Sequence, residues 1–323
     1  MALLAGLACV GGITGVALRT RTTRPDDEFN PLIIHGGPAT PSLSLIHLAE
    51  SKLLSPIVEN IRFQMFRGID EVRAGLVGNG WPISMVPSQL AANLFNRKMP
   101  IYYMSVLTWG LMYFISRAQR ITNIEQFAGS RVALPSKNDL FDQMFNYWLN
   151  KAGFHKDRDI KITYMSSPVE AAQWLHAGQV DHALLPEPQC SAAIMQSNEV
   201  PLYRSLPFGA LRQFVDGDHR IPMAGIMIHQ HVLDRRPEIV SKLRQALHQS
   251  VRWARNNPLA AAQASVPYFS IPAPIIAAAV EHSNLVADDA TLYQSELHDY
   301  FEMICEFNSD MIGGKAPDIG FYI

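Results

Sequence analysis

The chain has 323 residues, of which 48% are hydrophobic and 17% are charged, so it can bury a large core. This length predicts two domains or one two-lobed body. Its 27 basic and 29 acidic residues give a formal net charge of −2, and no basic patch stands out. We therefore expect no nucleic acid among its partners.

The first eighteen residues, MALLAGLACVGGITGVAL, carry no charged side chain. This apolar run predicts a secretory signal peptide, with Gly15-Val16-Ala17 as its cleavage site. No Lys or Arg precedes the run, so an uncleaved membrane anchor is an alternative, and Cys9 after Ala8 could be a lipobox cysteine. Residues 19–29 then form a polar tether, and we expect a periplasmic or otherwise extracytoplasmic protein.

Two stretches about one hundred residues apart share one plan. The first begins at residues 31–54 and the second at 131–154, each as a strand, a polar loop and a helix. Alternating strands follow at 59–68 and 158–167. Each copy continues with a helix, a glycine (Gly78 or Gly178), a short strand ending in proline (82–87 or 182–186) and an Ala-containing helix.

Strands that alternate with helices predict mostly parallel sheets flanked by helices, here in two similar α/β lobes. Residues 100–116 contain two strand-like runs around Thr108-Trp109-Gly110 and predict the first crossing between lobes. Residues 223–229 read as another strand, residues 236–258 as a long helix, and the remainder to 311 as more helices. We expect lobe 1 to comprise 30–112 and 224–323, lobe 2 to comprise 113–223, and two hinge crossings to join them.

Motifs for catalysis or metal binding are missing from the sequence. It contains no GxSxG elbow, P-loop, HExxH or GxGxxG, and His229 and His231 form at most half a metal site. We expect no enzyme, no cofactor and no metal. Cys190 and Cys305 lack CxxC spacing and predict buried free thiols, with a single disulfide between them as the alternative.

The stretch GQVDHALLPEP, residues 178–188, places two acids on one strand. Asp181 precedes the strand, where an acid can bond the turn backbone, and is expected to be structural. Glu187 follows the strand, at the edge where open α/β sheets bind ligands. Five residues at about 3.3 Å each separate the two acids by well over 10 Å, too far for a shared proton.

Several pieces of the chain together resemble a known family. They are the export segment, residues 124–136, 178–188 and 221–229, the helix at 236–258 and the ending IGGKAPDIGFYI. In this order they resemble the periplasmic substrate-binding proteins of ABC importers, in the nitrate, sulfonate, taurine and thiamine-precursor branch. The resemblance covers residues 30–323 and implies the two-lobed type II periplasmic-binding-protein fold, no catalysis, and delivery of a small molecule to a membrane permease.

The sequence departs from this family at one place, because Gly80-Trp81-Pro82 stands where relatives often carry Gly-x-x-Asp. The cysteine-rich motif of related fungal enzymes for thiamine pyrimidine is missing. The alternative function is an enzyme on the same fold, acting on a small carboxylic acid or a thiamine-pyrimidine precursor. We expect a monomer.

The candidate ligand-binding residues follow strands at their carboxyl ends. They are Gly37, Pro38, Thr40, Thr108 and Trp109 in lobe 1, and Ser136, Asn138, Ser166 and Glu187 in lobe 2. Ser136 and Asn138 precede a helix and could bind an anion or simply cap it, and Trp109 could stack on a ligand or pack in the hinge. The charge of Glu187 would repel nitrate and favour a ligand with a donor group, such as an amino-sulfonate or an aminopyrimidine.

Overall fold

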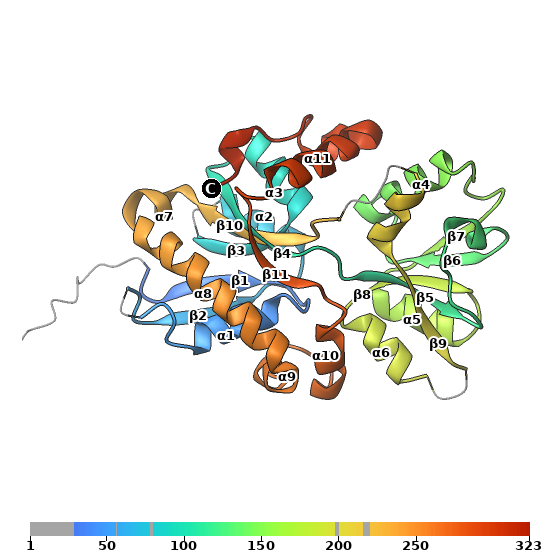
Figure 1. The fold of residues 1–323 in the computed structure, drawn as a ribbon, viewed down its shortest axis with the longest axis horizontal. Coiled ribbons are helices and arrows are strands. Elements are labelled where there is room, and N and C mark those ends of the chain that lie inside the picture. The colour runs from blue at the N-terminus through green and yellow to red at the C-terminus, as the bar shows by residue number, and fades with distance from the viewer. Residues whose placement is uncertain (1–28, 56, 78–79, 198–199, 216–219) are drawn as a thin grey trace, which may run out of the picture.

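Two lobes lie side by side in the computed structural model, each built on a β-sheet with helices against it (Figure 1). The structure describes residues 29–323 apart from 56, 78–79, 198–199 and 216–219. The predicted export segment, its tether to residue 28 and Cys9 lie outside the described residues. The two-lobed α/β fold expected from the sequence is confirmed.

The sheet of the first lobe has six strands, and most of their lengths are buried. In spatial order they are β11 (Leu285–Asp289), β4 (Ile101–Thr108), β10 (Ala224–His229), β3 (Ile83–Pro87), β1 (Leu32–Gly36) and β2 (Ile61–Met65). The sheet of the second lobe has five, in the order β7 (Lys161–Tyr164), β6 (Arg131–Leu134), β8 (His182–Pro186), β5 (Met112–Arg117) and β9 (Leu202–Pro207).

The helices cover the sheets on both faces and occur in both lobes. With the first sheet lie α1 (Ser42–Glu50), α2 (Ile69–Val77), α3 (Ser88–Asn96), α7 (Gln230–Arg235), α8 (Pro237–Asn256), α9 (Pro258–Ser265), α10 (Ala273–Val280) and α11 (Gln294–Asn308). With the second lie α4 (Leu140–Lys151), α5 (Pro168–His176) and α6 (Gln189–Met195). Short 3-10 helices are η1 (Ile124–Phe127), η2 (Phe208–Phe214), η3 (Ser309–Ile312) and η4 (Ile319–Phe321).

Both sheets are mixed rather than mostly parallel. The repeated units pair in parallel, as β1 with β2 and β3, and β6 with β7 and β8. The strands at the crossings pair antiparallel, because the chain enters each sheet directly from the other lobe without a crossover helix. The chain passes to the second sheet between β4 and β5 and returns between β9 and β10. The exact lobe boundaries at 112–113 and 223–224 stay predictions.

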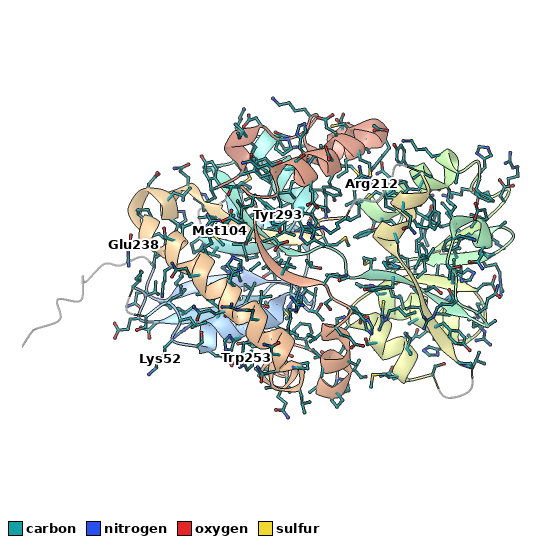
Figure 2. The ribbon with its side chains drawn as sticks, viewed as in Figure 1. Lys52, Met104, Arg212, Glu238, Trp253 and Tyr293 are labelled. Atoms are coloured by element: carbon teal, nitrogen blue, oxygen red, sulfur yellow. The ribbon has the colours of Figure 1, made fainter. Side chains whose placement is uncertain are left out.

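Helix α8 shows how the sequence positions the helical layer. Its buried residues recur every three or four positions, from Ile239 and Leu243 through Leu247 to Val251, which is one face of a helix. Pro237 occupies its first turn, where a backbone N–H would have no acceptor within the helix, so proline costs no helical hydrogen bond. Helix α8 packs on α1. Trp253, which Figure 2 labels on α8, stacks on His47 of α1 with ring centroids 4.0 Å apart.

Two strands were not predicted from the sequence. Strand β9 reads LYRSLP, whose arginine, serine and proline interrupt the apolar pattern, and β11 reads LVADD, which ends in two acids. Strand β11 lies between α10 and α11, so the expectation of helices alone up to residue 311 is wrong at Leu285–Asp289. The polar side chains interrupt the hydrophobic alternation in both strands, whereas the edge strands β2 and β7 keep it.

The lobes also touch outside the crossings. On one side, α11 meets α4, where the Tyr147 hydroxyl donates to Glu306 and Asn308 Nδ2 donates to Gln143 Oε1 at 2.8 Å. On the other side α10 packs against α6. Figure 1 places these two helix pairs above and below the crossing strands. The lobes are therefore held at three places rather than at the crossings alone.

The described cysteines bear on the predicted state of the thiols, whereas the predicted N-terminal anchor lies outside the described residues. Cys190 is buried, Cys305 is partly buried, and both are free thiols. In the described part of the chain, no helix combines the length and the hydrophobicity that crossing a bilayer requires.

Gly225 of β10 has no room for a side chain. A Cβ there would lie 2.1 Å from the Tyr103 hydroxyl and 2.3 Å from the carbonyl oxygen of Ser105, both on the neighbouring strand β4. Because the carbonyl cannot move without breaking the strand pairing, Gly225→Ala is expected to lower the free energy of unfolding by about 1–3 kcal/mol. Urea denaturation measures this change. Gly68→Ala is the matched control, since nothing lies within 4 Å of its Cβ position; equal effects of the two changes would contradict the prediction.

Candidate functional site

The topology brings the predicted site residues to two facing sheet edges. Strand β4 ends at Thr108 and β5 begins at Met112, so this end of the first sheet faces the second lobe. Strands β1 and β3 run in the same direction as β4, because β10 lies antiparallel to both β3 and β4. Strand β8 is antiparallel to β5 and parallel to β6, so β6, β7 and β8 end facing the first lobe. Ligands of open α/β sheets bind at such edges.

The loop between β1 and α1 supplies the first group of candidates. Thr40 is fully buried, and its hydroxyl has no hydrogen-bond partner in the structure. Helix α1 follows at once, with Pro41 at its N-cap, no side-chain cap and no acidic residue in its first turn. Gly37 is buried and its carbonyl accepts from the Ser42 hydroxyl, whereas Pro38 is exposed. The first backbone N–H groups of α1 already donate to carbonyls of the preceding turn, whereas the Thr40 hydroxyl at this helix start has no partner. An acceptor or anionic group at this point would meet that hydroxyl and the positive end of the helix dipole.

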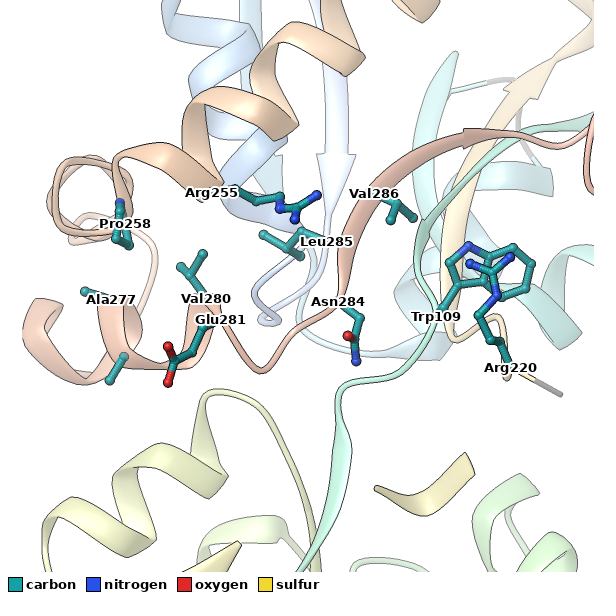
Figure 3. A pocket seen from close by; sticks show the side chains of 11 residues that line it. Trp109, Arg220, Arg255, Pro258, Ala277, Val280, Glu281, Asn284, Leu285 and Val286 are labelled. Carbon is teal, nitrogen blue, oxygen red and sulfur yellow. The ribbon is translucent and has the colours of Figure 1, made fainter. Parts of the chain in front are cut away.

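Thr108 and Trp109 serve the hinge. The Thr108 hydroxyl donates to the carbonyl of Ser283 at 2.7 Å, and Trp109 Nε1 donates to Asp288 Oδ2 at 2.7 Å. The Arg220 guanidinium, which belongs to the return crossing, stacks 4.1 Å from the centroid of the Trp109 ring (Figure 3). These contacts join both crossings to β11 and favour hinge packing over ligand stacking for Trp109.

The starts of α4 and α5 on the second lobe are already capped. Asp139 is the N-cap of α4 and accepts from the backbone N–H of Asp142, while the Asp142 carboxylate accepts from the backbone N–H of Asn138. The Ser166 hydroxyl and backbone N–H both donate to Glu170 at the start of α5. Two carboxylates at α4 disfavour an anion there. The N-caps are Asp139 and Ser167 rather than Asn138 and Ser166, so a ligand contact at the latter two stays a prediction.

Ser136 stands beside a cation that the sequence analysis missed. Ser136 is half-buried, and the next residue, Lys137, is exposed with its ammonium 5.7 Å from the centroid of the Tyr164 ring. No ion pair between Lys137 and a described residue is present. A lysine in a polar loop after a strand was the available signal.

Glu187 lies in a closed network rather than facing the space between the lobes as a free charge. Its side chain is fully buried and forms an ion pair with Arg204 of β9. Its other carboxylate oxygen accepts from the hydroxyl and backbone N–H of Ser191, at 2.9 and 3.1 Å. Burial raises the pKa of Glu187, and the Arg204 guanidinium opposes that rise. The premise that Glu187 presents an uncompensated negative charge to a ligand is therefore corrected, whereas a ligand contact at Glu187 stays a prediction.

Asp181 has the structural contacts that the sequence suggested. Its carboxylate accepts from the backbone N–H of Arg131 at 2.8 Å and from the Arg131 guanidinium at 2.6 Å. These hydrogen bonds lower the pKa of Asp181. They tie the turn before β8 to the start of β6 at the edge opposite to Glu187.

The histidine pair shows no metal geometry. The Nδ1 atoms of His229 and His231 lie 2.6 Å apart, which is a direct hydrogen bond between the rings. Among the residues that the structure describes, no group of three or more His, Cys, Asp or Glu side chains could hold a metal ion.

The sequence matches a known family model, and the fold is similar to those of several solved structures. Residues 116–267 match the model of the NMT1-like family. An ABC transporter protein of Parabacteroides distasonis has a TM-score of 0.74 at 18% identity, covering 90% of this chain and 98% of that one. The sulphonate-binding protein SsuA of Escherichia coli has a TM-score of 0.69 at 16% identity, covering 90% and 91%. The nitrate-binding protein NrtA of Synechocystis has a TM-score of 0.62 at 13% identity, covering 87% and 83%.

These findings confirm the resemblance predicted from the sequence, and at such identities the solved structures establish a shared fold. No curated protein matches the chain.

Proposed function

Because this chain resembles the NMT1-like and sulphonate-binding group in a matched segment and in its fold, we propose that it is an extracytoplasmic solute-binding protein. It captures a small solute between its lobes and delivers it to the permease of an ABC transporter. It acts as a monomer, binds without chemical conversion and needs no cofactor. The names of SsuA and NrtA refer to the binding of sulphonate and nitrate, so both are candidate solute classes.

The solute we favour carries an anionic group that faces α1. The observation that carries this is the buried Thr40 hydroxyl, which has no partner at the uncapped start of α1. A buried hydroxyl without a partner costs free energy, so a bound acceptor would offset that cost. The positive end of the helix dipole favours a negative group at the same point, and exposed Lys137 stands at the opposite edge. The ion pair with Arg204 removes the repulsion expected from Glu187.

The identity of the solute can be tested directly. Native mass spectrometry after gentle purification should show a retained small molecule, and calorimetry should rank taurine, a short alkanesulfonate, nitrate and an aminopyrimidine. We expect an organic anion to bind best, and X-ray scattering should show compaction on binding. Conversion of the solute at catalytic rates would instead support an enzyme on this fold, whereas preference for the uncharged aminopyrimidine would contradict the anionic group.

Thr40→Val replaces the unpartnered hydroxyl by a methyl group of the same shape. Loss of a hydrogen bond to a charged group is worth about 1.5–3 kcal/mol, so we expect solute affinity to fall by roughly tenfold or more. The melting temperature should stay the same or rise, because no internal hydrogen bond is lost. Thr122→Val, at an exposed threonine of the second lobe, is the control and should leave affinity unchanged. Unaltered affinity in Thr40→Val would remove Thr40 from the site.

A further inference from the structure

A separate cavity lies beside the edge strand β9 and reaches the boundary between the lobes. It has a volume of about 420 Å³ and takes its walls from β5, β9, α6 and the turn after α10. Tyr113 Oη donates to the carbonyl of His282 at 2.7 Å, a hydrogen bond between the two lobes at the wall of the cavity. None of Gly37, Thr40, Ser136, Asn138 or Ser166 lines it.

The lining of this cavity combines cations with aromatic rings. Arg204 and Arg120 both line it, and so do Tyr113 and Tyr203. No Asp or Glu occurs among the described lining residues. His282 also lines the cavity; burial and the nearby Arg204 charge lower its pKa, and its Nε2 lies 2.9 Å from the Glu281 carboxylate. Ile194, Leu202 and Pro207 supply apolar wall.

The two arginines offer different interactions. The Arg204 side chain is 15% exposed, pairs with Glu187, donates to Ser191 and lies 5.0 Å from the centroid of the Tyr113 ring. A guanidinium has five N–H groups, so donors remain for a ligand. Arg120 is exposed and forms no ion pair with a described residue, so its charge is uncompensated.

A larger hinge-side cavity of about 790 Å³ is less suited to an anion (Figure 3). Its lining contains the carboxylate of Glu281, and its Arg220 already makes two-pronged hydrogen bonds to Glu296. Only Arg255 supplies a cation without a described partner there. The smaller cavity beside β9 therefore has the clearer chemical preference.

We propose that the cavity beside β9 is a second binding site, distinct from the proposed solute site at Thr40, for a small organic oxyanion with a flat apolar body. The oxyanion accepts charge-assisted hydrogen bonds from the guanidinium of Arg120 and from the remaining N–H groups of Arg204. The flat body lies against Tyr203 and the apolar wall of Ile194 and Leu202. The proposal does not depend on which solute the protein carries between its lobes.

Calorimetry with 2-naphthoate tests the proposal, with the uncharged 2-naphthamide as the matched ligand. We expect the naphthoate to bind at least tenfold more tightly than the amide. Arg120→Gln should weaken naphthoate binding roughly threefold to tenfold, and Ile194→Trp, which fills the cavity, should abolish it. Arg62→Gln, at an exposed arginine of β2, is the control and should bind as the unaltered protein does.

A double variant tests the role of Arg204 in binding, because changing Arg204 alone would leave the buried Glu187 without its ion-pair partner. In Glu187→Gln/Arg204→Met both charges of the buried pair are removed together, and naphthoate affinity should fall at least tenfold while circular dichroism stays unchanged. Equal binding of naphthoate and naphthamide would overturn the proposal. So would naphthoate binding that Thr40→Val weakens and Arg120→Gln does not, because the probe would then occupy the space between the lobes.

Discussion

Replacing Arg204 alone by methionine is expected to lower the free energy of unfolding by about 3–5 kcal/mol, which is the usual cost of leaving one member of a buried ion pair without its partner. Glu187 is fully buried, and without Arg204 the described hydrogen bonds to its carboxylate come from Ser191. Burial raises the pKa of the carboxyl, so removal of the guanidinium leaves either a buried charge or a protonated acid. Guanidinium chloride denaturation at neutral pH measures the loss.

Two variants isolate the buried charge as the cause. Glu187→Gln/Arg204→Met removes both charges and should recover most of the lost stability, since apolar replacements of buried pairs are often neutral. Arg158→Met breaks the pair with Asp159, in which the arginine side chain is 64% exposed, and should cost less than about 1 kcal/mol. If Arg204→Met costs no more than Arg158→Met, the pair does not stabilise the second lobe.

Acid should destabilise the protein between pH 6.5 and about 4, well before most carboxylates are protonated. Burial lowers the pKa of both His35 and His182 from 6.5 to about 4. Their neutral rings fit the fold, where His35 stacks on Trp81 at 3.9 Å and His182 bonds Ser116 at 2.9 Å. Below pH 6.5 the unfolded chain binds protons that the folded protein does not. Stability present above pH 6.5 is therefore lost as the pH falls toward 4, by about 2–3 kcal/mol for each histidine.

Urea denaturation at a series of pH values from 7.5 to 5 measures this slope. His35→Phe keeps an aromatic ring against Trp81 and should remove a large share of the pH dependence. His248→Gln, at an exposed histidine of α8, should retain the full slope. A stability that is flat between pH 7.5 and 5 would show that these two rings are protonated in the folded protein.

The sequence was sufficient for the repeated part of the fold because its signals are local. Hydrophobic runs, polar loops and turn glycines predicted β1 to β3 and β6 to β8, together with the helices between them. Gly153 follows α4 with a φ of +82°, the left-handed conformation that favours glycine after a helix. Strands β9 and β11 lack such a pattern, because polar side chains and a proline or paired acids interrupt their apolar residues.

The hydrogen-bond partners of the site residues could not be predicted, because strand pairing between distant parts of the sequence brings them together. Position along the strand predicted that Glu187 follows β8 at the ligand-facing edge. Its partner Arg204 lies 17 residues later on β9, and only the pairing of β5 with both β8 and β9 brings the two together. Trp109 is fixed likewise by Asp288, from a strand that the sequence did not reveal.

The contacts above and below the crossings limit how the lobes can move. A rotation in the plane of Figure 1 that separates α11 from α4 would press α10 into α6, and the reverse rotation would do the opposite. Either rotation therefore compresses one of the two helix pairs, and close-packed side chains resist that compression. A rotation out of that plane is different, since it slides both helix pairs along each other, and its main resistance comes from lateral hydrogen bonds such as those of Glu306 and Asn308.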